Sequence, residues 1–327
     1  VNFTFVFNFK TDCTKPTSLL TSGGEPINSG TRVKGEVTYS ATDASGIKYI
    51  YFKRGSGVFS RTTSSVYTIP TSSNDGDYYF FAVDNAGNIS ETVYVTIDNT
   101  SPLGKLYLDN GALVSSGTVT NRAFKYTAID PGGIENFYIK RPGGNYESYT
   151  DGTLVSGQNG TYYFKAIDTV GNESIESSII YDNTPPVVII KAGNNIVESG
   201  SIISMPRISA ISSDTGSGVE NMEYIPPAGS SYIAYISGTE LTADGVYYFR
   251  AKDMAGNISS ASNVTIDNTI PVGKLYLDGG TMVASGHITN KAFKYAATDV
   301  NGIKRLYLKS QGGPVENDIA NTILSGI

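Results

Sequence analysis

Aspartates at a fixed spacing are the residues of this 327-residue sequence best suited to chemistry. Three pairs recur whose members are 14 positions apart: Asp84 and Asp98, Asp168 and Asp182, and Asp253 and Asp267. Carboxylate oxygens are the ligands that Ca²⁺ prefers. Because 14 residues is about the length of a strand pair, each pair is a candidate calcium site. We favour the other interpretation, in which each aspartate accepts hydrogen bonds within its own turn and the protein needs no cofactor.

Other reactive residues are isolated. His287 is the only histidine and Cys13 the only cysteine. A Ser-His-Asp or Cys-His site needs its histidine beside a nucleophile, and nothing in the other repeats prepares such a site at the position of His287. Cys13 stands where related segments have Asn, so it is either a chance substitution or a thiol for an intermolecular bridge. We therefore expect no catalytic residues and no enzymatic activity.

The aspartates belong to a repeat of three sequence blocks. The first block begins at positions 86, 84 and 85 residues apart, at Asp12, Asp98, Asp182 and Asp267. The second block contains Asp43, Asp130, Asp214 and Asp299. The third block, with the sequence Tyr-Tyr-Phe before Asp-x-x-Gly-Asn, is present in the first three repeats. Three blocks in one order at one spacing indicate tandem copies of a single unit.

Short segments of alternating apolar and polar residues, separated by turn residues, surround these blocks and indicate β-strands. In the second repeat we expect strands near 103–109, 119–129, 134–140, 145–150, 153–156, 160–167 and 174–181. Phe124, Tyr126 and Ala128 fall on one face of their strand, and Lys125 and Thr127 on the other. The sequence therefore predicts an all-β fold, with tandem immunoglobulin-like antiparallel β-sandwiches of about seven strands each, in an elongated array with almost no helix.

The Tyr-Tyr-Phe block carries a family resemblance. It resembles the immunoglobulin stretch in which a tyrosine-corner Tyr lies two residues before the second disulfide Cys. The matching tyrosines are Tyr78, Tyr162 and Tyr247, and the Cys position is filled by Phe80, Phe164 and Phe249. Together with the Asp-Asn-Thr-x-Pro junctions, the chain resembles bacterial immunoglobulin-like repeats of surface adhesins and of stalk regions of secreted glycosidases. The junctions also resemble shortened cadherin linkers, which implies calcium.

The repeats divide the chain at the junction aspartates. We expect immunoglobulin-like units at 12–97, 98–181 and 182–266, and an incomplete fourth unit at 267–327. Residues 1–11 have the pattern of a final strand from a preceding unit, with Phe3, Phe5, Phe7 and Phe9 in alternation. This segment either belongs to a neighbouring unit of a longer array or acts as a donor strand between molecules.

Charge and composition narrow the partners. A net charge of -6 disfavours nucleic acid as a partner. The sequence contains no run of 18 apolar residues, which is the length needed to span a bilayer. The resemblance implies an extracellular, cell-surface location and a structural spacer, stalk or fibre whose partners are other units of the array or further copies. Two alternatives remain: a glycan- or protein-binding adhesin module, with the divergent third repeat as candidate, or a non-catalytic region of a secreted glycosidase. Exposed tyrosines such as Tyr79, Tyr163 and Tyr248 keep a carbohydrate-binding surface open.

Overall fold

The computed structural model describes residues 4, 6, 10–309 and 315–317. These residues form strands and turns without a helix, so the all-β prediction is confirmed. The chain divides into two compact units, Val1–Asp182 and Asn183–Ile327. Within the described part, no helix has the length and apolar character needed to cross a membrane. The candidate strand-exchange residues Phe3, Phe5, Phe7 and Phe9 lie outside the described residues.

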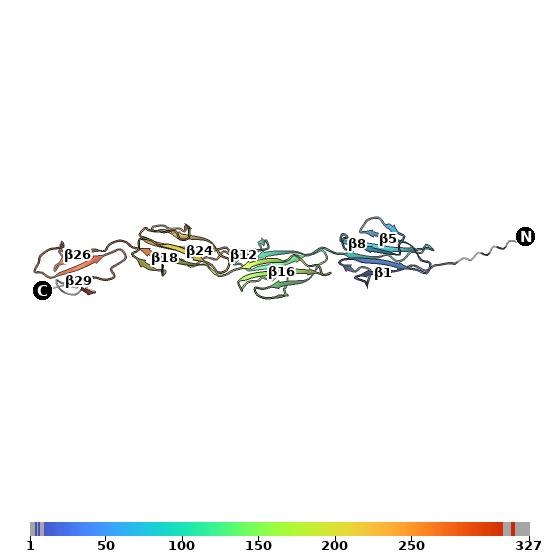
Figure 1. Cartoon of the computed structure of the whole chain (residues 1–327), viewed down its shortest axis with the longest axis horizontal. Helices are drawn as coiled ribbons and strands as arrows, with labels where there is room; N and C mark the ends of the chain where they lie inside the picture. Colours follow the sequence, from blue (N-terminus) through green and yellow to red (C-terminus); the bar gives the residue numbers. More distant parts are fainter. Residues whose placement is uncertain (1–3, 5, 7–9, 310–314, 318–327) are drawn as a thin grey trace. The chain divides into compact units, whose positions relative to one another are not determined.

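Module 1, the first sandwich of the first unit, has two sheets (Figure 1). The first sheet has the order β2 (Glu25–Ile27), β1 (Thr17–Ser22), β4 (Val37–Thr42) and β7 (Val66–Ile69). The second has the order β3 (Arg32–Val33), β9 (Val93–Ile97), β8 (Gly76–Asp84), β5 (Ile47–Arg54) and β6 (Ser60–Thr62). The pairings are antiparallel except between β3 and β9, which run parallel.

Module 2 completes the first unit with the same plan. Its smaller sheet has the order β11 (Leu113–Val114), β10 (Leu103–Leu108) and β13 (Phe124–Ile129). Its larger sheet has the order β12 (Thr118–Thr120), β17 (Ser177–Tyr181), β16 (Gly160–Asp168), β14 (Ile134–Lys140) and β15 (Tyr146–Ser148). The short edge strands bring the totals to nine strands in module 1 and eight in module 2, more than the seven expected.

The second unit contains module 3 and the strands that we call module 4. Module 3 pairs β19 (Asn195–Val197), β18 (Val187–Ala192) and β21 (Ser209–Ser213) in one sheet. Its other sheet has the order β20 (Ser201–Ile203), β25 (Ser262–Ile266), β24 (Gly245–Asp253), β22 (Val219–Ile225) and β23 (Ile233–Tyr235). Module 4 has β27 (Met282–Val283), β26 (Val272–Leu277) and β28 (Phe293–Thr298), and a pair β29 (Tyr307–Lys309) and β30 (Val315–Asn317).

The single strand expected over 119–129 is wrong. The structure splits it into β12, which pairs with β17, and β13, which pairs with β10 in the opposite sheet. Between them, the Arg122 backbone N–H donates to the Thr120 hydroxyl at 3.0 Å, a local turn that lets the chain change sheets. The expected strand at 153–156 is also absent, because Val155 forms only an isolated bridge with Phe124.

Each of modules 1 to 3 has its own core. Along β16 the burial alternates from Tyr162 through Phe164 and Ala166 to Asp168, as period-2 patterning requires. The Phe164 ring is fully buried and stacks on Tyr126 from the opposite sheet, with centroids 5.2 Å apart. Phe80 and Phe249 are buried equally at the same position of modules 1 and 3. An aromatic ring thus joins the two sheets where antibody domains have a disulfide.

Candidate metal centre

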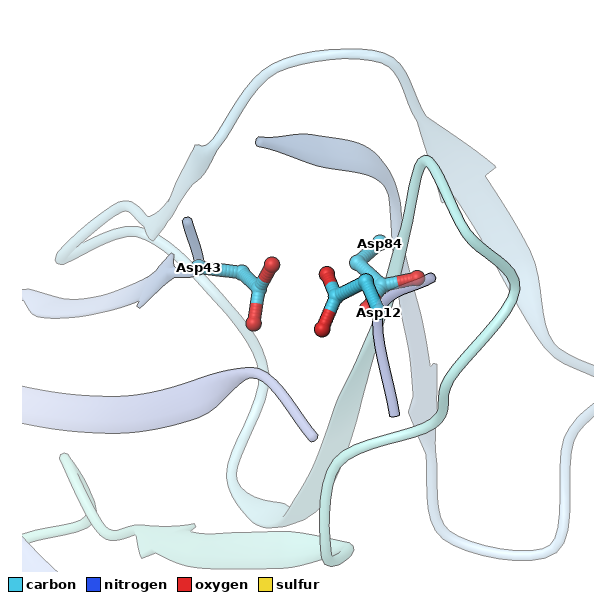
Figure 2. A group of neighbouring side chains, drawn as sticks. All are labelled: Asp12, Asp43 and Asp84. Carbon is cyan, nitrogen blue, oxygen red and sulfur yellow. The ribbon is translucent and has the colours of Figure 1, made fainter. Parts of the chain in front are cut away.

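Aspartates from all three sequence blocks converge at one end of each sandwich of the first unit. In module 1, Asp12, Asp43 and Asp84 each offer a carboxylate oxygen, and these atoms lie within 4.8 Å of one another. Figure 2 shows the carboxylates of Asp12 and Asp43 facing each other, with Asp84 beside Asp12. Asp98, Asp130 and Asp168 form the same arrangement in module 2. We call these groups the module 1 triad and the module 2 triad.

Strand ends place the triad. In module 1, Asp84 is the last residue of β8, and Asp43 directly follows β4. These two strands belong to opposite sheets, so the two carboxylates meet where the sheets end together. Asp12 arrives on the segment that leads into β1. The triad therefore joins the entering chain to both layers of the sandwich.

The candidate calcium pair of Asp84 and Asp98 is wrong. β8 and β9 are antiparallel, with Gly76 opposite Ile97, so Asp98 lies beside the start of β8 and Asp84 at its end. One nine-residue strand, or about 30 Å, separates these ends. Asp84 instead meets Asp12. The pairing of Asp168 with Asp182 fails in the same way, because β16 and β17 are also antiparallel and Asp168 meets Asp98.

The sequence-based calcium candidates did not include the second-block aspartates, although these aspartates recur in every repeat. Asp43 and Asp130 recur at equivalent positions of the repeat, directly after a strand with an alternating apolar face. Their recurrence alone marked them as part of the repeated unit. Only the meeting of β4 with β8, and of β13 with β16, identifies them as members of the triads.

Hydrogen bonds favour the ionised forms of Asp84 and Asp12 in the module 1 triad. Asp84 Oδ1 accepts from the backbone N–H groups of Gly87 at 2.6 Å and Asn88 at 2.8 Å. Burial acts to raise the pKa of Asp84, but the bonds from Asn88 and Gly87 outweigh it and lower the pKa. The Thr14 hydroxyl and N–H lower the pKa of Asp12 to about 2. Among the described residues, the buried Oδ2 atom of Asp12 has no hydrogen-bond partner.

The module 2 triad differs by one cation. Arg32, from β3 of module 1, donates through Nη1 to Asp98 Oδ2 at 2.9 Å. Burial raises the pKa of the Asp130 carboxyl, and the neighbouring charges of Asp98 and Asp168 raise it further. Asp130 Oδ2 is buried and, within the described part of the chain, unpartnered. Three carboxylates around one guanidinium leave net negative charge at this point.

Gly132 leaves open the space beside the module 2 triad. A Cβ atom at this position would lie 2.3 Å from Asp98 Oδ2 and 3.1 Å from Asp130 Oδ1. Both distances are shorter than a normal contact, so a side chain here would displace a carboxylate. The donor set of oxygen atoms only, the unpartnered oxygen and the absent side chain fit a hard divalent cation such as Ca²⁺.

An asparagine fixes each entering chain to its triad. The Asn88 side-chain amide donates to the Asp12 carbonyl oxygen at 3.1 Å and to Asp84 Oδ2 at 2.8 Å. In module 2, the Asn172 amide donates to the Asp98 carbonyl oxygen at 3.0 Å and to Asp168 Oδ2 at 2.7 Å. The Asn side chain of the Gly-Asn turn in the third block thus acts as a clasp: it links the junction backbone to the carboxylate that ends the long strand.

The remaining aspartate candidates also accept hydrogen bonds. Asp182, the last residue of the first unit, accepts from Asn159 Nδ2 at 2.9 Å. In the second unit, the fully buried Asp253 accepts from the Asn257 side chain at 2.8 Å. Asp267 accepts from Asn301 Nδ2 at 2.9 Å and from Thr269, whose hydroxyl lowers the pKa of the Asp267 carboxyl.

The first tyrosine of each Tyr-Tyr-Phe block donates a hydrogen bond to the backbone. Each hydroxyl donates to the carbonyl oxygen four residues earlier: Tyr78 to Asn74 at 2.9 Å, Tyr162 to Gln158 at 2.8 Å, and Tyr247 to Ala243 at 2.9 Å. This is the geometry of a tyrosine corner. Cys13 is an exposed free thiol and His287 is exposed.

Comparison with known proteins adds structural similarities only. No protein-family model matches the chain, and no curated protein matches its sequence. Fibronectin(III)-like modules of CbhA from Clostridium thermocellum are 15% identical, with a TM-score of 0.27 over 51% of this chain and 94% of that chain.

Two further solved structures are similar at the same level. SGBP-B of the Bacteroides ovatus mixed-linkage glucan utilization locus, in complex with a mixed-linkage heptasaccharide, is 10% identical, with a TM-score of 0.21 over 81% of this chain and 74% of that chain. Dimeric latent PorU from Porphyromonas gingivalis is 13% identical, with a TM-score of 0.21 over 78% of this chain and 34% of that chain. Similarities this low carry no argument about function.

Proposed function

We propose that this chain is a non-catalytic spacer region of a bacterial extracellular surface protein or fibre, built from tandem immunoglobulin-like sandwiches. The observation that carries the proposal is the separation of the cores. Each of modules 1, 2 and 3 has a cluster of buried residues drawn from its own strands, centred on Phe80, Phe164 and Phe249. A sandwich with its own core can bear load and repeat along a chain without help from its neighbours.

Contacts at the junction of modules 1 and 2 support a spacer with restricted bending. The Gly35 N–H donates to Asn99 Oδ1 at 2.9 Å, and the Asn99 N–H donates to Asp75 Oδ1 at 2.8 Å. Arg32 adds its ion pair with Asp98, and Pro102 is buried directly after the junction. A fixed proline φ and three polar contacts limit the backbone freedom between the two sandwiches.

Force spectroscopy of the whole chain between two marker domains tests the spacer function. Independent modules of about 85 residues should unfold in separate events, each lengthening the chain by about 250 Å. The marker domains supply the calibration of length in the same trace. A single event that released modules 1 to 3 together would contradict independent load-bearing units.

A second candidate function, calcium-dependent stiffening of the junctions, is favoured by the triads. The unpartnered Oδ2 atoms of Asp12 and Asp130 are the specific observation, because buried carboxylate oxygens ordinarily have partners. Each triad would supply three carboxylate ligands of the roughly six to eight that Ca²⁺ takes, with water or carbonyl groups supplying the rest. The module 1 triad has no cation comparable to Arg32 among the described residues, so it is the stronger candidate.

Thermal unfolding with added Ca²⁺, added Mg²⁺ or a chelator tests this second function. Calcium should raise the Tm of the parent chain, and the rise should shrink in Asp43→Asn, which removes one triad charge. The exposed Asp151 supplies the matched control, since Asp151→Asn leaves both triads intact. Equal Tm values with calcium and with chelator would show that the aspartates serve only their own turns.

A further inference from the structure

Aromatic rings cover the solvent side of the larger sheet of module 1. Alternation places Ile50, Phe80 and Val95 in the core, so their neighbours along the strands point outward. The outward rings come from β5, β8 and β9 and from the residue before β6. We call this group the aromatic face: Tyr49, Tyr51, Phe59, Tyr79, Phe81 and Tyr94.

The rings of the aromatic face pack against one another across strands. Tyr51 and Phe81 stack with centroids 4.7 Å apart, and Phe59 contacts Phe81 edge-on at 5.0 Å. Tyr79 stacks on Tyr94 at 5.5 Å. Phe59 and Tyr94 are each 39% exposed. Ring pairs held by their neighbours form a rigid surface that loses little conformational entropy on binding.

Cations lie over these rings without acidic partners. Lys53 Nζ lies 4.9 Å from the Phe59 centroid and 5.2 Å from the Tyr79 centroid. The Arg61 guanidinium lies 4.5 Å from the Tyr49 centroid. No ion pair joins Lys53 or Arg61 to a carboxylate in the described structure. The positive charge on this face is therefore available to an anionic partner.

Modules 2 and 3 carry ion pairs on the corresponding face. The comparison concerns the residue three positions before the aspartate that ends β8, β16 or β24, together with its partner on the neighbouring strand. This cross-strand pair is Tyr51 and Phe81 in module 1, Tyr138 and Lys165 in module 2, and Glu223 and Arg250 in module 3. Lys165 pairs with Glu173 at 3.2 Å, and Arg250 pairs with Glu223 at 2.7 Å. Module 1 differs from both in having two stacked rings at this position. Its Lys53 over Tyr79 has a counterpart in Lys140 over Tyr163 of module 2, whereas no cation–ring contact among the described residues of module 2 corresponds to Arg61 over Tyr49. The outward face of the larger sheet thus has a different chemical character in module 1 from that in modules 2 and 3, as expected of a face with its own binding role.

We propose that the aromatic face of module 1 binds an acidic polysaccharide. Sugar rings offer C–H groups for contact with aromatic rings, and their hydroxyls can bond the hydroxyls of Tyr49, Tyr51, Tyr79 and Tyr94. Carboxylate or sulfate groups on the sugar would pair with Lys53 and Arg61. A sheet face suits an extended polymer, which needs no enclosed pocket.

Charge density favours a polysaccharide over a nucleic acid. A single-stranded nucleic acid carries a phosphate at every nucleotide, and its binding sites follow the backbone with a positively charged groove. Three cations, Lys48, Lys53 and Arg61, lie over rings of the aromatic face, on a chain whose net charge is -6. A neutral polysaccharide would leave these charges unused. An acidic polysaccharide, with charge on some of its sugars, matches both the rings and the cations.

Affinity electrophoresis of the whole chain tests the proposal with polygalacturonate and chondroitin sulfate as probes, which separate carboxylate from sulfate recognition. Dextran is the neutral probe and an oligo-dT strand the nucleic-acid probe. We expect retardation by at least one acidic polysaccharide, weakened by added salt. Phe59→Ala and Arg61→Gln should each weaken binding about tenfold.

The control variants are Val58→Ala, next to Phe59 in the same loop and 90% exposed, and Tyr163→Ala, the module 2 counterpart of Tyr79. Both should bind as the parent does. Unchanged Tm values in Phe59→Ala and Arg61→Gln keep a loss of binding distinct from a loss of fold. The proposal fails if neither acidic polysaccharide retards the chain, if both face variants bind like the parent, or if oligo-dT or dextran binds equally well.

Discussion

Asn172 donates its side-chain amide to the carbonyl oxygen of Asp98 at 3.0 Å, across 74 residues of sequence. The same amide group donates to Asp168 Oδ2 at 2.7 Å. One side chain therefore ties the junction to the end of β16, and its removal should affect the junction and the buried carboxylate together.

We expect Asn172→Ala to lower the free energy of unfolding by about 1–3 kcal/mol, because it leaves the fully buried Asp168 Oδ2 without this donor. Denaturant unfolding of the whole chain measures the change. The exposed Asn145 provides the control, since Asn145→Ala should stay within about 0.5 kcal/mol of the parent. Equal effects of the two substitutions would contradict the role of Asn172 as a clasp.

A side chain at position 132 should disrupt the module 2 triad. The Cβ of Gly132→Ala would fall 2.3 Å from Asp98 Oδ2, a group already held by Arg32. The required displacement should cost about 1–3 kcal/mol of stability. Gly144→Ala is the matched control, because its Cβ would meet its nearest neighbour, the Arg141 carbonyl oxygen, at 3.4 Å. Thermal unfolding of both variants checks the difference.

Calcium and Arg32 should compete for the module 2 triad. Arg32→Gln removes the guanidinium from Asp98 while leaving three carboxylates together. Without calcium, the variant should lose about 1 kcal/mol, since Arg32 is partly exposed and its ion pair is screened by solvent. With calcium, the rise in Tm should exceed that of the parent chain. A calcium response identical to the parent would show that this triad holds no cation.

Alkaline pH should destabilise module 2 through Tyr126. Burial raises the pKa of this hydroxyl above its ordinary 10.0, while its hydrogen bond with Ser174 Oγ, at 3.1 Å, acts in the opposite direction. The folded state favours the neutral phenol, so this stability is complete below about pH 10 and declines as the pH rises above it.

The check is the Tm measured from about pH 8 to pH 11, with tyrosinate absorbance followed in parallel. Tyr126→Phe should reduce the alkaline fall of Tm and lower stability at neutral pH by about 0.5–1.5 kcal/mol through the lost hydrogen bond. The decline should not vanish, because burial also raises the pKa of Tyr39 in module 1. An unchanged alkaline profile in Tyr126→Phe would contradict this assignment.

The location of the proposed binding face could not be found by comparing the sequences of the repeats. The divergent third repeat was the sequence-based candidate for binding, whereas the aromatic face that we propose belongs to module 1. Tyr51 and Phe81 are 30 residues apart, and their stacking depends on the register of β5 against β8. Register is a property of strand pairing, so the sequence displayed the aromatic residues without showing that they form one surface.

The all-β fold, the recurring unit and the inward face of strands such as Phe124–Ile129 could be predicted from the sequence, because alternation is a local property of extended backbone. Which aspartates meet could be learned only from the folded arrangement of the strands. Asp84 and Asp98 are close in sequence but lie at opposite ends of a sandwich, while Asp12 and Asp84 meet across a whole module. Strand direction and sheet assignment set these distances, and neither is encoded in local periodicity.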